Sequence, residues 1–165
     1  MRKVIPILSV MLLVMGTSFI LANPVLLEYV NVSPSQNISI TTGAPANYSG
    51  QAEAGVYNLL IDFNPSDGVD NYQTFTGYCV DPAFSEPNPE LYDIVAIPTA
   101  TGYQAAAWIF ANYGTPSVAA DAANVQSAIW IVVDGITVNS PTSNASTIAA
   151  NALAAVSGGW TAPEW

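Results

Sequence analysis

The hydrophobic pattern of this 165-residue chain changes its period near Pro82, and this change constrains the fold more than any other feature. Between residues 25 and 81, β-branched and aromatic residues alternate with polar ones, and turn residues separate the runs, as is typical of strands. Beyond Pro98 the sequence is rich in alanine, with helical spacing and glycines where helices would end. We therefore predict a single α+β domain, with antiparallel strands in its β-rich first half and three helices in its second half.

The flanking turn and capping residues place the expected elements. The sequence Asn-Pro-Ser-Asp-Gly at residues 64–68 predicts the turn of an antiparallel hairpin, whose second strand ends near Cys79. Strands are expected at residues 26–32, 37–42, 55–63 and 72–80. Helices are expected at residues 103–113, ending at Gly114, and from a Ser117 N-cap to about residue 132, ending at Asp134-Gly135. A third helix is expected from about residue 146 to Gly158-Gly159.

The first residues of the chain have the pattern of an export signal. Arg2 and Lys3 precede an apolar run that extends to Ala22. We expect residues 1–22 to be a signal peptide and residues 23–165 to form the mature domain. Retention of the first segment as a membrane anchor is the alternative. No later stretch is apolar enough to span a bilayer, so the cleaved protein is expected to be secreted or extracellular, and not membrane-bound unless a partner holds it at the cell surface.

Arg2 and Lys3 are the only basic residues, against 12 acidic residues and no histidine. After cleavage, the unpaired carboxylates of this acidic protein would repel nucleic acid and anionic lipid, which excludes both as partners. Catalysis by Ser-His or Cys-His pairs, lysine Schiff bases and histidine-bound metals all need residues that the chain lacks. We expect a protein that is not an enzyme and that has no cofactor and no metal site. Residues 62–73 have the acidic residues and the glycine of a calcium-binding loop, but the glycine comes one place late and Gln73 stands where such a loop has glutamate. These differences argue against a calcium site.

The chain has one cysteine, Cys79. Exported proteins usually pair their cysteines, so a single one indicates a thiol that joins two chains, a buried inert thiol, or a thiol committed to another bond.

A second feature lies in the predicted helix that follows Ser117. Gln126 and Trp130 are four residues apart and therefore share one face of this helix. The neighbouring face carries the expected core stripe, which comprises Val118, Ala122, Val125 and Ile129. Gln126 is expected at the edge of this stripe, within reach of a neighbouring element.

Two short segments, Tyr78-Cys79-Val80 and Val125-Gln126-Ser127-Ala128-Ile129-Trp130, resemble the motifs of the thioester domains of bacterial surface adhesins. The order is also similar, with a cysteine on a strand first and a glutamine on a helix later. A helical segment, Ala106-Ala107-Trp108-Ile109, lies between them as in that family. The resemblance covers residues 55–133, and it implies that residues 23–165 form a thioester-like domain.

The resemblance implies an internal thioester between the sulfur of Cys79 and the side-chain carbonyl of Gln126. Such a bond reacts with amines, so the implied function is covalent cell adhesion through a protein lysine or a polyamine on a surface or matrix molecule. Tyr78, Trp130 and Trp108 are expected to shield the bond from water. Asp81 is expected either to position the amine or to cap the turn at Pro82.

Two other functions remain open on the sequence. The Cys79–Gln126 bond could be an unreactive cross-link in an extracellular structural or matrix protein. Alternatively, Cys79 could be a buried thiol in a module that binds its ligand without a covalent bond.

Overall fold

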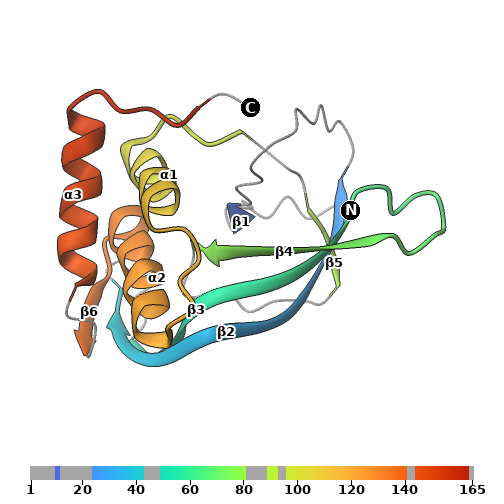
Figure 1. Cartoon of the computed structure of the whole chain (residues 1–165), viewed down its shortest axis with the longest axis horizontal. Coiled ribbons are helices and arrows are strands. Elements are labelled where there is room, and N and C mark those ends of the chain that lie inside the picture. Colours follow the sequence, from blue (N-terminus) through green and yellow to red (C-terminus); the bar gives the residue numbers. More distant parts are fainter. Residues whose placement is uncertain are drawn as a thin grey trace.

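The computed structural model describes residues 10–11, 24–42, 49–80, 89–92, 96–140 and 144–163. Asp81 and the expected cleavage site at Ala22 lie outside these residues. The prediction of an α+β domain is confirmed: an antiparallel sheet occupies the N-terminal half and three helices occupy the C-terminal half (Figure 1). The elements are β1 (Val10–Met11), β2 (Val25–Thr41), β3 (Ser49–Asp62), β4 (Tyr72–Cys79), β5 (Glu90–Tyr92), α1 (Thr101–Tyr113), α2 (Ala119–Asp134), β6 (Thr137–Ser140) and α3 (Ala145–Ser157).

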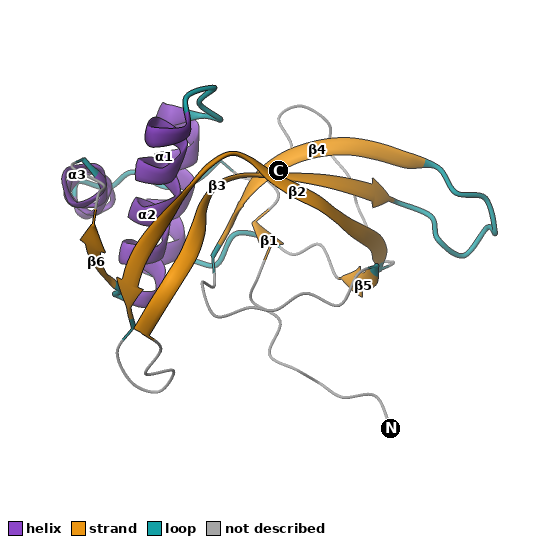
Figure 2. Ribbon diagram, turned by 90° about the horizontal axis from the view of Figure 1, so that it is seen from below, coloured by secondary structure: helices purple, strands orange, loops and turns teal. Residues whose placement is uncertain are grey.

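The strands run in the order β1-β4-β3-β2-β5, and β6 pairs with β2. The predicted hairpin is formed by β3 and β4, with Asp62 opposite Tyr72 at its closed end. In its turn, the N–H of Asp67 donates to the carbonyl of Asn64. The three helices gather at one end of the curved sheet, while the hairpin extends away from them (Figure 2).

Two strands are longer than the sequence predicts. β2 is one strand where two were expected, and it passes residues 33–36 with register shifts between Tyr29 and Asn31 and between Val32 and Ser35. β3 begins at Ser49, six residues before the expected start. The reason is mutual pairing: residues 49–54 have weak strand propensity, yet they bond along residues 36–41.

The predicted helix ends are confirmed at Gly114 and Gly135, whose φ angles of 56° and 65° are readily adopted by glycine. The predicted Ser117 N-cap is wrong, because Val118 holds that place without a side-chain cap hydrogen bond. Val118 is also 56% exposed and so lies outside the core stripe. The other three expected stripe residues, Ala122, Val125 and Ile129, are buried among the helices.

Helix α2 is the central element of the molecule. It packs against α1 and α3 on one side and against β2, β3 and β4 on the other. All nine residues from Ala122 to Trp130 are buried. Its sheet-facing side includes Ala123 and Trp130, which pack with Ile38 and Ile40 of β2. Gln126 and Ser127 fall between these two along the same side of the helix, by the spacing of a helix face.

The other end of the sheet has its own apolar cluster, which is remote from α2. This cluster comprises Val25, Leu27, Leu59, Ile61 and Tyr92. Among the described residues, no helix is both long enough and apolar enough to cross a membrane.

Candidate functional site at the junction of β4 and α2

The site lies where β4 runs past its pairing with β3 and meets the helices (Figure 1). Gly77 is the last residue of β4 that pairs with β3, opposite Tyr57. Tyr78 and Cys79 therefore continue the strand beyond its pairing with β3. Their main-chain groups need other partners, because an unpaired buried N–H or C=O is costly.

Gln126 of α2 takes the place of the missing strand at Cys79. The main-chain N–H of Cys79 donates to Oε1 of Gln126 over 3.0 Å. The Nε2 of Gln126 donates to the main-chain carbonyl of Cys79 over 2.6 Å. Gln126 is 0% exposed and Cys79 is 7% exposed, so both bonds are made away from solvent. One amide thus satisfies both main-chain groups of one residue.

This pairing also sets the orientation of the Gln126 amide. An amide carries an acceptor on one side and donors on the other, so only one orientation matches the N–H and C=O of Cys79. The carbonyl carbon of Gln126 is therefore held beside Cys79. The structure brings together the two residues that the sequence motifs singled out, although they are 47 residues apart in the chain.

Tyr78 packs toward α1, away from the side of the strand on which the Cys79 side chain starts. Its hydroxyl donates to the carbonyl of Gly114 over 3.0 Å, and its ring meets Phe110 edge-on with centroids 6.0 Å apart. Burial raises the pKa of Tyr78 above its ordinary value. Tyr78 is thus a fixed, uncharged wall between the strand and α1.

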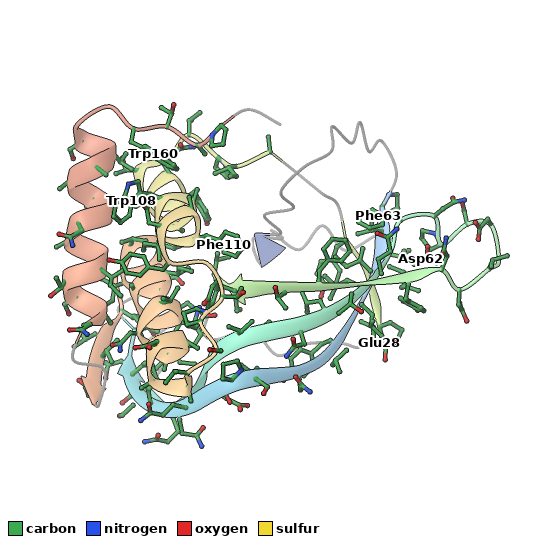
Figure 3. The ribbon with its side chains drawn as sticks, viewed as in Figure 1. Glu28, Asp62, Phe63, Trp108, Phe110 and Trp160 are labelled. Atoms are coloured by element: carbon green, nitrogen blue, oxygen red, sulfur yellow. The ribbon has the colours of Figure 1, made fainter. Side chains whose placement is uncertain are left out.

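Of the two tryptophans expected to shield the site, Trp130 is 1% exposed and fills the space between α2 and the sheet, one turn beyond Gln126. Trp108 lies on another side of α1. Its ring meets that of Tyr113 (Figure 3 labels Trp108 on α1).

Phe110 is the aromatic residue of α1 that reaches Tyr78, and sequence reasoning missed it. Two residues along a helix point to nearly opposite sides, so Trp108 and Phe110 cannot both face the strand. The sequence contained no signal that favoured one over the other.

Two polar atoms next to Gln126 on α2 have no hydrogen-bond partner in the described part of the chain. They are Oγ of Ser127 and Nε1 of Trp130. Both are buried, on the side of the helix that faces the sheet. Two unpartnered polar atoms thus lie within one turn of the Gln126 amide.

The acidic turn of the β3–β4 hairpin uses its carboxylates within the turn itself. Asp62 accepts from the N–H of Asn64, and Asp67 accepts from the N–H of Val69 and from the side chain of Asn64. The described ranges contain no group of three or more residues with metal-ligating side chains.

No known protein-family model, curated protein or solved structure matches this chain.

Proposed function

We propose that this protein is an exported thioester domain, in which the sulfur of Cys79 is bonded to the side-chain carbonyl of Gln126. The bond reacts with an amine on a surface or matrix molecule and attaches the protein covalently. The observation that carries the proposal is the pair of buried hydrogen bonds between the Gln126 amide and the main chain of Cys79.

Bond formation is an acyl transfer within the protein. The Cys79 sulfur attacks the Gln126 carbonyl carbon, the thiol proton leaves with the nitrogen, and ammonia is released. Negative charge develops on Oε1 as the sulfur adds. The main-chain N–H of Cys79 already points at this atom over 3.0 Å, so it stabilises the developing charge. The Nε2 that must depart is held at the opposite side of the amide, by the carbonyl of Cys79.

The second step is the reaction of the thioester with an amine, which can occur once in each molecule. An incoming primary amine attacks the thioester carbonyl, an amide forms between the target and the Gln126 side chain, and the Cys79 thiol is released. No step regenerates the thioester, so the protein acts stoichiometrically and not as an enzyme. Water competes with the amine, and the burial of the Gln126 side chain between α2 and β4 limits this loss.

The composition of the exported chain supports this use. The only lysine is Lys3, which belongs to the expected signal peptide. Once that segment is removed, the N-terminal amine is the only amine that one copy presents to another. The thioester therefore reacts with amines of other molecules and not with lysines of a second copy.

A second candidate function rests on the burial of Gln126 and Cys79. Gln126 is fully buried and Cys79 nearly so, and an amine must reach the bond between them. If the site does not open, the same bond is an inert cross-link that reinforces an extracellular structural protein.

The test is the intact mass of the exported, purified protein before and after incubation with methylamine, with a Cys79→Ala variant as control. The expected result is a mass lower by one ammonia, converted by methylamine to an adduct with one titratable thiol. A deficit that methylamine leaves unchanged would establish the inert cross-link instead. The full mass with a thiol present from the start would show that no thioester forms, and would leave a non-covalent binding module.

A further inference from the structure

The outer edge of β4 is occupied at the site itself. β1 pairs antiparallel with β4, with Val10 opposite Cys79 and Met11 opposite Tyr78. It lies on the edge of β4 that faces away from β3. Val10 and Met11 belong to the segment that we expect to be removed on export, so export would empty this edge.

The edge can bond a strand because of how the main chain is oriented. Successive residues of a strand direct their N–H and C=O groups to opposite edges. The N–H and C=O of Cys79 point to Gln126. The N–H and C=O of Tyr78 therefore point to the opposite edge, where β1 lies. The residue opposite Cys79 is then in a non-hydrogen-bonded pair, while its two neighbours bond to β4.

From this geometry we propose that the emptied edge of β4 binds an extended segment of the target protein as an added strand, and thereby presents a lysine to the thioester. The inference rests on the proposed function and deepens it. The substrate is a lysine within an extended polypeptide, in preference to a free amine or a polyamine.

The pairing selects which lysine can react. Directly opposed residues place their side chains on the same face of a sheet, and Cα atoms of a non-hydrogen-bonded pair are about 4.5 Å apart. A lysine opposite Cys79 therefore extends along the face on which the Cys79 side chain lies. A lysine opposite Tyr78 points to the other face, toward the helices that Tyr78 contacts.

The electrostatics favour such a partner. The full chain has a net charge of −10, including the two basic residues of the expected signal peptide. Their removal makes the exported protein more acidic. A lysine-bearing segment is thus attracted to it at long range.

The test uses the exported protein and a nine-residue peptide of alternating threonine and valine with one central lysine, blocked at both ends. Adduct formation is followed by intact mass, with blocked free lysine and methylamine as reference amines. We expect the peptide to react about tenfold faster than blocked lysine, since a few main-chain hydrogen bonds hold it in place.

Two modified peptides distinguish strand addition from other reasons for a faster reaction with the peptide. N-methylation of both residues that flank the lysine removes the N–H groups that face β4, and should return the rate to that of blocked lysine. N-methylation of the lysine itself alters an N–H that faces away from β4, and should leave the enhancement in place.

The outcomes are distinct. If methylamine reacts but the peptide is no faster than blocked lysine, or if the two methylated peptides behave alike, strand addition is wrong and the thioester proposal stands. If the protein has its full mass and ignores methylamine, both proposals are overturned.

Discussion

At the scale of single residues, Gln126 has a structural task that is separate from its proposed chemistry. It bonds the N–H and the C=O of Cys79 at the point where β4 no longer pairs with β3. Buried polar groups cost far more when left unpaired than they contribute when paired. The Gln126 side chain is therefore needed for stability even where no thioester can form.

Replacing Gln126 by leucine tests this task in a Cys79→Ala background, in which no thioester forms. The substitution removes two hydrogen bonds from the buried main chain of residue 79, so we expect the free energy of unfolding to fall by about 3 kcal/mol. Urea unfolding followed by circular dichroism measures the change. Gln73→Leu, on an exposed position of β4, is the matched control and should change stability little. Equal stability of the two variants would show that the Cys79–Gln126 hydrogen bonds do not form.

Tyr78 gives a prediction in alkaline solution. Burial raises its pKa, so the folded protein holds the phenolic proton more tightly than the unfolded chain, whose tyrosines titrate near pH 10. The stabilisation is complete below about pH 10 and is lost as the pH rises above it. In the same Cys79→Ala background, stability should fall above about pH 10, and Tyr78→Phe should make this fall shallower. An unchanged slope in the phenylalanine variant would contradict the assignment.

At the scale of elements, the position of α2 depends on how closely α1 approaches it. A Cβ atom added to Gly102, in the first turn of α1, would collide with the main-chain carbonyl of Val132 near the end of α2. A backbone carbonyl cannot move aside as a flexible side chain can. The absence of a side chain at Gly102 therefore permits the contact between the two helices that flank the site.

Gly102→Ala should force α1 away from α2 and lower the free energy of unfolding by about 1–3 kcal/mol, although alanine is the better helix former. Thermal unfolding measures the loss. Thr101→Ala, at the exposed neighbouring position, is the control and should not destabilise the protein. A stabilised Gly102→Ala variant would mean that the two helices are not packed this closely.

At the scale of the whole molecule, the proposed bond would join the sheet to the helical half. It would close a loop between residues 79 and 126, which includes all of α1 and the first part of α2. Such a link restricts the unfolded chain more than the folded one. Loop entropy assigns it a stabilisation of about 4 kcal/mol.

Cleavage of the thioester by methylamine should therefore lower the free energy of unfolding by about 4 kcal/mol, to a value close to that of the Cys79→Ala variant. Parallel urea titrations of the untreated protein, the methylamine adduct and the variant compare the three. The same treatment of Cys79→Ala should have no effect. An adduct as stable as the untreated protein would show that the thioester bond contributes nothing to the free energy of unfolding.

The sequence by itself determined what depends on local pattern. The change of hydrophobic period predicted the α+β class, residues 64–68 predicted the turn between β3 and β4, and glycines marked the ends of α1 and α2. The motifs around Cys79 and Gln126 predicted that these two residues interact, because the residue types and their spacing are visible in the sequence itself.

Only the tertiary structure decided what depends on packing between distant segments. β2 is one long strand because β3 bonds along it, and α2 begins without the Ser117 cap because contacts on all sides stabilise it. Phe110, not Trp108, meets Tyr78, because the rotation of α1 follows from its packing against α2 and α3. The outer edge of β4 beside Cys79, where β1 pairs, is likewise a property of the sheet order, and no local pattern encodes it.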